Sequence, residues 1–269
     1  MFRGPMDLAW EEIETPQLME ARDALIRPIA VARCDLDPAI AMGLYPMPAP
    51  FVMGHEMVGE VIEVGDSVSA FRPGDRVIVP FQLSCMTCAP CLRGHTNACE
   101  NVPSGTAFGL GPHGGMDLGG ALAEVVRVPW ADVMLIPLPE GMDPVTAAGI
   151  PDNVSDGYRC VAAPLAERPG APVLVVGGLA PSVGLYAVMS ALALSAEKVV
   201  YVDDNAARLQ LAETAGAEVI NAKGQWGTLK LNQKFPIVVD ANVLDTGRTL
   251  ALRSVEACGV CTSVSGGAT

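Results

Sequence analysis

The feature that most limits how this chain can fold is an alternation of two kinds of segment after residue 171. Short apolar runs, "PVLVVGG", "KVVYVDD", "AEVINA", "FPIVVDAN" and "GVCTSVSG", are separated by predicted helices, among them 206–215 and 247–257. Strands that are joined through helices run parallel in one sheet, because each helix returns the chain to the edge where the previous strand began. We therefore predict a doubly wound parallel sheet for this half.

Residues 171–196 contain no charged side chain, and a run of this length resembles a membrane span. Gly177, Gly178 and Pro181 interrupt it in the middle, which favours a strand, a turn and a helix that begins near Ser182. We expect no contact with a membrane interior.

The first half has a different pattern. Between residues 50 and 140 the apolar runs "MVGEVIEVG", "GDRVIVPF", "ALAEVVRVPW" and "DVMLIPLP" are separated by Gly, Pro and Asp, which predicts a β-rich body. A helix over 144–163 is predicted where the pattern changes. The chain is therefore divided into two domains, 1–150 and 151–269.

Four cysteines lie in the segment "CMTCAPCLRGHTNAC" (85–99), with the spacing C-x2-C-x2-C-x7-C. Eight cysteines in 269 residues are too few for a disulfide scaffold, and the start "MFRGPMDLAWEEIE" lacks the apolar stretch of a secretory signal. We expect a cytoplasmic, reducing location, where clustered thiols bind metal more often than they form disulfides. Thiolates of Cys85, Cys88, Cys91 and Cys99 are predicted to hold a structural Zn2+.

The charge balance excludes two classes of partner. With 17 basic and 30 acidic residues, the formal net charge is 17 − 30 = −13. Nucleic acids and anionic membranes would be repelled by this net field, so neither is expected as a partner.

A glycine-rich loop, "GGLAPSVG", joins the strand "VLVV" to the next helix. Amide N–H groups at a helix N-terminus above the carboxyl edge of a parallel sheet bind phosphate, so the loop predicts a pyrophosphate site. Asp203 ends the next strand, where a carboxylate accepts hydrogen bonds from the adenosine ribose, and Asp204 would repel a 2′-phosphate. NAD is therefore predicted, with contacts from Gly177, Gly178, Ser182, Val183, Gly184 and Asp203. The structural alternative is that the glycines allow close packing and that Asp203 caps a helix.

A second group of polar residues is spread along the chain. His55 and Glu56 stand in "FVMGHEMVGEV", Cys34 follows another strand in "VARCDLD", and "PDNVSD" is an acid-rich turn. A lone histidine is more often structural than a ligand. Cysteine, histidine and a carboxylate together, however, would supply a catalytic zinc with three protein ligands and an open fourth position.

These motifs identify a resemblance. The chain resembles the zinc-dependent medium-chain alcohol dehydrogenases through "GHEMVGEV", "VGDSVSAFRPGDRV", the four-cysteine lobe and the glycine loop. It is most similar to the branch with the glutathione-independent formaldehyde dehydrogenases. The resemblance implies a GroES-like β-barrel catalytic domain and a Rossmann domain. The chain ends after the fifth predicted strand, so the Rossmann sheet would lack its sixth strand, which often pairs across a dimer. A homo-oligomer is possible, but the usual dimer strand is absent.

The resemblance also assigns roles. It implies that Cys34, His55 and Asp152 hold the catalytic zinc, that Glu56 can approach the metal, and that Asp37 orients His55. Asp152 could instead be a helix N-cap or turn residue, and Asp37 a turn acid before Pro38.

The implied reaction is zinc-dependent, NAD-linked hydride transfer between a small alcohol and its aldehyde or ketone, with two zinc ions per chain. The alternatives are a degenerate, non-catalytic zinc- and nucleotide-binding protein and an aldehyde dismutase that holds NAD(H) tightly. Leu36 stands where the family has a proton-relaying hydroxyl, and Asp156 stands where it often has threonine. Cys258 and Cys261 are both expected to be ordinary buried thiols.

Overall fold

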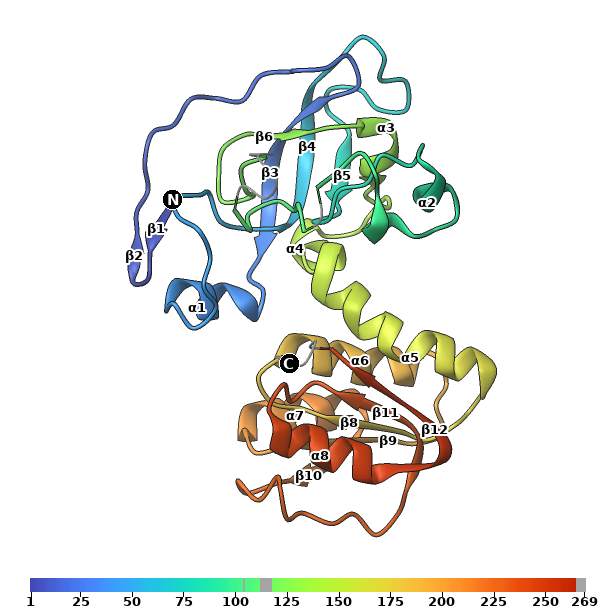
Figure 1. Cartoon of the computed structure of the whole chain (residues 1–269). Helices are drawn as coiled ribbons and strands as arrows, with labels where there is room; N and C mark the ends of the chain where they lie inside the picture. Colours follow the sequence, from blue (N-terminus) through green and yellow to red (C-terminus); the bar gives the residue numbers. More distant parts are fainter. Residues whose placement is uncertain (104, 112–117, 265–269) are drawn as a thin grey trace. The chain divides into compact units, whose positions relative to one another are not determined.

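The computed structural model describes residues 1–103, 105–111 and 118–264, and the chain divides into two compact units, Met1–Asp152 and Asn153–Thr269. Figure 1 labels most of the helices and strands of both units. Each unit has its own sheet and its own hydrophobic core.

The first unit is built on an antiparallel sheet with the strand order β6-β3-β4-β5-β7. The strands are β3 (Ala24–Ala32), β4 (Glu56–Val64), β5 (Arg76–Val79), β6 (Val126–Val128) and β7 (Ile136–Pro137), and a small hairpin is formed by β1 (Phe2–Gly4) and β2 (Asp7–Leu8). The β-rich pattern of residues 50–140 is thus realised as strands β4 to β7, and the strand expected before Cys34 is β3.

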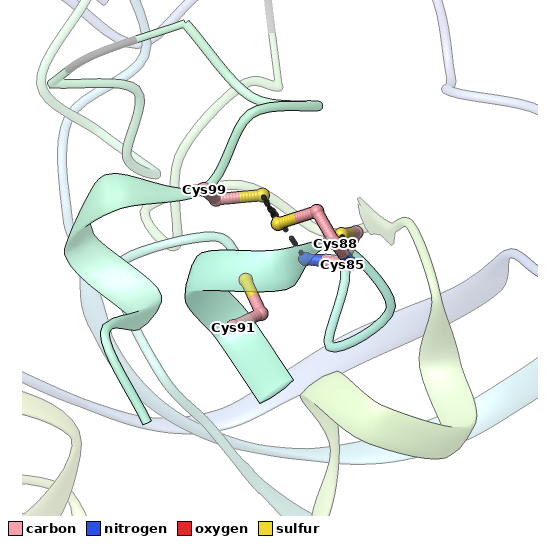
Figure 2. A group of neighbouring side chains, drawn as sticks. All are labelled: Cys85, Cys88, Cys91 and Cys99. Atoms are coloured by element: carbon pink, nitrogen blue, oxygen red, sulfur yellow. Dashed lines mark hydrogen bonds between the residues drawn. The ribbon is translucent and has the colours of Figure 1, made fainter. Parts of the chain in front are cut away.

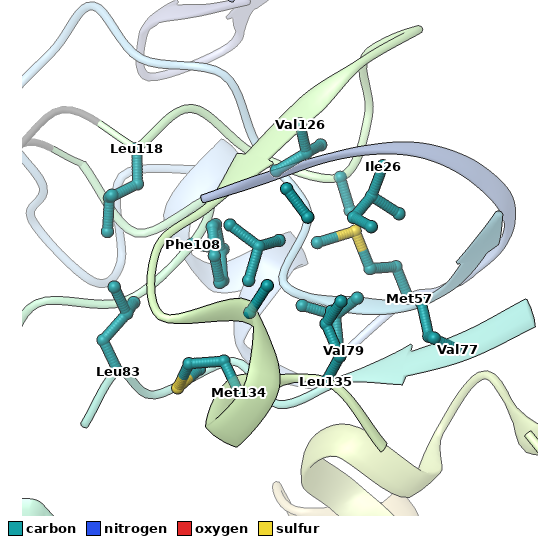
Figure 3. Close-up of a cluster of buried hydrophobic side chains, with 14 of the residues drawn as sticks. Ile26, Met57, Val77, Val79, Leu83, Phe108, Leu118, Val126, Met134 and Leu135 are labelled. Atoms are coloured by element: carbon teal, nitrogen blue, oxygen red, sulfur yellow. The ribbon is translucent and has the colours of Figure 1, made fainter. Parts of the chain in front are cut away.

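The core of this unit lies against one face of the sheet (Figure 3). Ile26 of β3, Met57 of β4 and Val77 of β5 are fully buried, and Phe108 and Met134 from outside the sheet pack against them. Each such side chain contributes about 1.5–3 kcal/mol when it leaves water. The ends of β3 and β4 therefore project from a well-packed support.

One predicted strand is only partly a strand. The run "DVMLIPLP" begins as the helical turn α3 (Ala131–Met134) and reaches the sheet only as the two-residue strand β7. Trp130 starts the turn in a left-handed conformation, with φ of 51°. Pro137 cannot donate to a neighbouring strand, so β7 is limited to an edge position.

The helix predicted over 144–163 is broken into three pieces. They are α4 (Pro144–Ala147), a π-helical turn (Ile150–Val154) and α5 (Ser155–Glu167). Pro151 has no N–H to donate to the preceding turn, which is a sufficient reason for the regular helix to stop there. Asp152 lies within the π-helical turn, a conformation that is rare and often found at functional sites.

The second unit contains a parallel sheet with the order β10-β9-β8-β11-β12. Its strands are β8 (Val173–Val176), β9 (Val199–Asp203), β10 (Glu218–Asn221), β11 (Phe235–Asp240) and β12 (Val255–Ser263), and its other helices are α6 (Pro181–Ala193), α7 (Ala206–Ala215) and α8 (Asp245–Ser254). The chain first builds outward from β8 to β10 and then returns to the other side of β8. The switch point between β8 and β11 is where such sheets bind ligands.

Both faces of this sheet are covered. Side chains of α5, α6 and α7 pack with Val173, Val175 and Tyr201, while α8 packs with Leu174 and Val176 on the opposite face. Neighbouring residues of β8 therefore point into different cores, which explains its unbroken apolar sequence. The predicted doubly wound parallel sheet is confirmed.

Among the residues that the structure describes, no helix combines the length and the apolar character needed to cross a membrane.

Candidate functional site

One group of candidate ligands lies at one end of the first unit's sheet. Strands β3 and β4 are antiparallel neighbours, and Ala32 at the end of β3 pairs with Glu56 at the start of β4. Cys34 follows β3 directly and His55 directly precedes β4, so the register of these strands brings the two side chains together. Asp152 reaches the same place from the π-helical turn.

The side chains of Cys34, His55, Glu56 and Asp152 form a compact group. The Sγ atom of Cys34 and the Nε2 atom of His55 lie 3.5 Å and 3.3 Å from the same oxygen, Oδ2 of Asp152. One potential ligand atom of each of the four residues lies within 4.8 Å of the others. His55 and Glu56 are almost inaccessible to solvent, at 2% and 0% exposure.

The electrostatics of this group favour a cation. Burial raises the pKa of the Cys34 thiol, and the neighbouring carboxylates raise it further. Burial lowers the pKa of His55, but the hydrogen bond with Asp152 and the charges of Asp37 and Glu56 outweigh it, so the net pKa is raised. Acidic side chains thus surround one imidazole, and a bound cation would neutralise the excess negative charge. Sulfur, imidazole nitrogen and carboxylate oxygen are all zinc ligands, so the donor set fits that ion.

Asp37 lies behind the imidazole, in the first turn of α1 (Leu36–Ala41). Its Oδ2 accepts a hydrogen bond from the Cys34 N–H at 2.9 Å, and its Oδ1 lies 3.7 Å from Nδ1 of His55. Neither Oδ1 nor Nδ1 has a hydrogen-bond partner elsewhere in the described part of the chain. Asp37 therefore contacts the turn backbone and also faces the ring, and burial raises the pKa of its carboxyl.

Asp152 and Leu36 also have defined positions in this unit. Helix α5 begins at Ser155 with Val154 at its N-cap, so Asp152 does not cap this helix. Leu36 packs with Phe2 and neighbouring apolar residues in a separate small core. Its side chain therefore has a packing role and carries no proton that could be exchanged.

The four cysteines of the segment 85–99 form the second candidate metal group (Figure 2). Cys88 precedes α2 (Ala89–Leu92), Cys91 lies in that helix, and Cys99 follows the 3-10 turn η1 (Thr96–Ala98). The short helix and turn bend the segment back on itself, so that the four sulfur atoms lie within 4.8 Å of one another. The Sγ atoms of Cys88 and Cys99 are 4.0 Å apart, and all four residues are free thiols.

Hydrogen-bond donors in this lobe point at sulfur. The N–H groups of Thr87 and Cys88 donate to Sγ of Cys85 at 3.4 Å, and the side-chain amide of Asn101 donates to it at 3.2 Å. Burial raises the pKa of Cys85, but these hydrogen bonds outweigh it and lower the pKa to about 5, whereas burial raises the pKa of Cys91 to about 12. Donors directed at sulfur stabilise the thiolate, the form that binds metal. The lobe fits a structural zinc ion.

In the second unit, the predicted pyrophosphate loop connects β8 to α6. Gly177 donates its N–H to the carbonyl of Val202 at 2.8 Å, and Gly184 donates its N–H to the carbonyl of Ala180 at 3.0 Å. These two glycines therefore supply space rather than donors: a Cβ at Gly177 would lie 2.5 Å from Oδ2 of Asp203. Ser182 and Val183, by contrast, lie in the first turn of α6, and the N-terminus of a helix is the end that binds phosphate.

Asp203 at the end of β9 is completely buried. The guanidinium of Arg208 donates to both of its oxygens, at 2.8 Å and 2.9 Å, and the hydroxyl of Tyr201 donates at 2.6 Å. Burial raises the pKa of Asp203, but these hydrogen bonds outweigh it and hold the pKa below its ordinary value. A ribose hydroxyl at this carboxylate would have to share it with Arg208.

Arg208 was not singled out from the sequence. The only local signal is a basic residue in the first part of the helix that follows Asp203, and this signal is weak. The N-cap of α7 is Asn205, whose side chain accepts the N–H of Arg208 at 3.1 Å. The alternative that Asp203 caps this helix is therefore wrong.

Known proteins resemble this chain over most of its length. The family model of the alcohol dehydrogenase GroES-like domain matches residues 20–140. A zinc-type alcohol dehydrogenase B of Aspergillus flavus is 33% identical over 225 residues, which cover 82% of this chain and 50% of that protein. The chain belongs to the zinc-type alcohol dehydrogenase family.

Two further members of this family are similar. A glutathione-independent formaldehyde dehydrogenase of Pseudomonas aeruginosa is 32% identical over 232 residues, covering 81% of this chain and 57% of that protein. The solved alcohol dehydrogenase from Thermus sp. ATN1 superimposes with a TM-score of 0.86 at 33% identity, covering 98% of this chain and 75% of that one. The chain spans about half the length of the curated relatives named here. The predicted combination of a GroES-like domain with a Rossmann sheet is confirmed.

Asp156 and Cys258, which the sequence singled out, have clear surroundings. Asp156, in the first turn of α5, forms an ion pair with Arg159 at 2.8 Å. Cys258 is exposed, so the expectation of a buried thiol is wrong for this residue; Cys261, in the same strand β12, is half-buried. Cys258 has φ of 60°, and this left-handed turn of the backbone interrupts the regular alternation of the strand.

Proposed function

We propose that this member of the zinc-type alcohol dehydrogenase family binds two zinc ions and NAD, and that it interconverts a small alcohol and its aldehyde or ketone by hydride transfer. The observation that carries the proposal is the convergence of Cys34, His55, Glu56 and Asp152 in one buried, negatively charged group. The names of the relatives, a zinc-type alcohol dehydrogenase and a formaldehyde dehydrogenase, support the same reaction class.

The proposed roles follow from the positions of the side chains. Cys34, His55 and Asp152 hold the catalytic ion, and Glu56 is near enough to replace a departing ligand. Asp37 faces Nδ1 of His55, which keeps Nε2 directed toward the ion. When bound, zinc supplies Lewis acidity toward the substrate oxygen, and NAD supplies the hydride acceptor.

The alcohol proton needs a path that does not use Leu36. Asp35 and Asp37 stand on either side of this leucine in the sequence, and we propose that one of them, or a water molecule, accepts the proton.

The remaining assignments complete the proposal. Cys85, Cys88, Cys91 and Cys99 hold a structural zinc ion, and their free thiols favour a reducing, cytoplasmic location. Residues 1–150 serve as the catalytic domain and 151–269 as the NAD-binding domain. The pyrophosphate binds at Ser182 and Val183, where α6 begins, and Asp203 with Asp204 favours NAD over NADP.

Zinc content and turnover test this proposal together. Elemental analysis of dialysed protein is expected to give about two zinc ions per chain, and a panel of small alcohols with NAD should produce NADH. Asp152→Ala should remove one ion and abolish turnover, whereas Asp66→Ala, at an exposed aspartate of the same unit, should change neither.

Other outcomes favour the alternatives. About one zinc ion per chain without turnover would contradict the proposal and favour a degenerate, non-catalytic protein. Conversion of an aldehyde into its alcohol and acid, with NADH retained by the protein and no net change in free cofactor, would favour the aldehyde dismutase.

A further inference from the structure

One buried side chain, Asn242, joins the glycine-rich β8–α6 loop to the loop after β11. Its Nδ2 donates to the carbonyl oxygen of Gly177 at 2.7 Å. The main chain adds two hydrogen bonds, from the N–H of Leu179 to the carbonyl of Asn242 at 3.2 Å and from the N–H of Ala180 to the carbonyl of Ala241 at 3.1 Å. These bonds tie the two loops together at the switch point of the sheet, beside the proposed pyrophosphate site.

Two glycines make the space for this side chain. A Cβ at Gly178 would lie 2.5 Å from Nδ2 of Asn242, and a Cβ at Gly247 of α8 would lie 2.0 Å from its Cγ. Both distances are far inside van der Waals contact, so neither position can carry a side chain while Asn242 keeps its place. One glycine of the loop and one glycine of the helix therefore both leave room for the same amide group.

The side-chain amide of Asn242 lowers the stability of the fold through one of its atoms. Asn242 is only 2% exposed, and its Oδ1 is buried and has no hydrogen-bond partner within the described residues. A buried polar atom without a partner destabilises the fold, so packing alone would favour an apolar residue here. The donation from Nδ2 to Gly177 is the contact that requires an amide.

The backbone around Asn242 is also held firmly. Its N–H donates to Oδ1 of Asp240 at 3.1 Å, and Oδ2 of the same aspartate accepts the hydroxyl of Ser263 at 2.9 Å. Val243 has φ of 74°, a left-handed conformation that β-branched residues adopt only where surrounding contacts impose it. The loop is therefore fixed from the side of β11 and β12, and the side chain of Asn242 is directed at the glycine loop.

We propose that Asn242 is a positioning residue for the pyrophosphate of the dinucleotide, an inference that rests on the proposed NAD binding. Its amide binds the Gly177 carbonyl and turns this negatively polarised oxygen toward the β11 loop. With that oxygen paired and the loop fixed, the anion meets the N–H groups of Ser182 and Val183 at the start of α6. Asn242 acts through the loop and does not itself touch the phosphates.

The inference is tested by the selectivity of the loss. The probes are ADP, which carries the pyrophosphate, and adenosine, which does not. Each probe is titrated against NADH bound to the whole protein, and the displacement of NADH is measured by its fluorescence. Asn242→Ala should weaken ADP binding by about tenfold, the ratio that corresponds to ~1.4 kcal/mol. Asn242→Asp keeps the shape but replaces the donor by a negative charge, so it should weaken ADP binding further. Adenosine affinity should stay unchanged in both.

The control is Asn221→Asp. Asn221 ends β10 at the edge of the same sheet, is exposed, and its side chain accepts the N–H of Lys223 at 2.8 Å, so this variant should bind both probes like the wild type. Unchanged ADP affinity in the Asn242 variants, or an equal loss for ADP and adenosine, would overturn the inference while leaving NAD binding intact. Failure of the wild type to bind NADH or ADP would overturn both the inference and the proposed NAD site.

Discussion

Replacing Arg208 by methionine should destabilise the second unit by about 2–3 kcal/mol. Arg208 donates to both oxygens of the fully buried Asp203, at 2.8 Å and 2.9 Å. Removing one partner of a buried ion pair costs about 3–5 kcal/mol, because an uncompensated charge stays behind. The cost is smaller here because the Tyr201 hydroxyl and two backbone N–H groups still donate to Asp203, and because 24% of the Arg208 side chain is exposed.

The effect should depend on pH in a defined direction. Burial raises the pKa of Asp203, but the hydrogen bonds from Arg208 and Tyr201 outweigh it, so the net pKa in the folded chain is lowered. A lowered pKa means that ionised Asp203 stabilises the fold above the unfolded pKa of about 3.9, and that this contribution is lost as the pH falls through the folded pKa. The difference between the wild type and Arg208→Met should therefore be full at neutral pH and shrink below about pH 4.

Urea unfolding followed by circular dichroism measures this difference. The matched control is Arg159→Met, which removes an exposed ion pair with Asp156 from α5 of the same unit; the Arg159 side chain is 70% exposed. The control should change the free energy of unfolding by less than about 0.5 kcal/mol. If Arg208→Met has an equally small effect at neutral pH, or if its effect grows in acid, the buried-pair argument is refuted.

Three further predictions concern metal, strain and thiols. Asp152→Ala should lower zinc from about two ions to about one per chain and leave NADH affinity unchanged. Cys88→Ser should lower the zinc content in the same way and should also lower the melting temperature, so elemental analysis together with thermal unfolding distinguishes the two variants. Val243→Gly should raise the free energy of unfolding in urea by about 0.5–1 kcal/mol, because glycine relieves the strain of the left-handed φ of 74° at some cost in chain entropy. A lower free energy of unfolding would show that the packing of the valine side chain outweighs the strain. Cys258 is exposed and should react with a thiol reagent long before Cys160, whose pKa burial raises to about 11; equal rates would contradict the assigned burial.

The two metal groups differ in how far the sequence could predict them. The cysteines from Cys85 to Cys99 are close in the chain, so a short helix and a turn suffice to bring their sulfur atoms together. Cys34, His55 and Asp152 are far apart in sequence, and their roles came from the resemblance of the motifs. Their proximity depends on the pairing of β3 with β4 and on the π-helical turn, neither of which the local pattern specifies.

Other contacts had at most a weak signal in the sequence. The pair of Asp203 with Arg208 replaces the open carboxylate that the strand end predicted. The bond from Asn242 to Gly177 joins residues of two different βα loops. Side-chain hydrogen bonds between separate segments follow from the packing of the elements and are therefore absent from periodicity and spacing.

The sequence by itself determined the elements that local forces control. Apolar periodicity separates the β-rich half from the alternating half, glycine and proline mark the turns, and closely spaced thiols define a metal lobe. Only the tertiary structure decided which distant side chains meet: the register of β3 against β4 assembles the buried ligand group, and the switch point between β8 and β11 places Asn242 against the glycine loop. The physical reason is that local patterns set the conformation of a segment, whereas sheet register and loop packing are set by the free energy of the whole core.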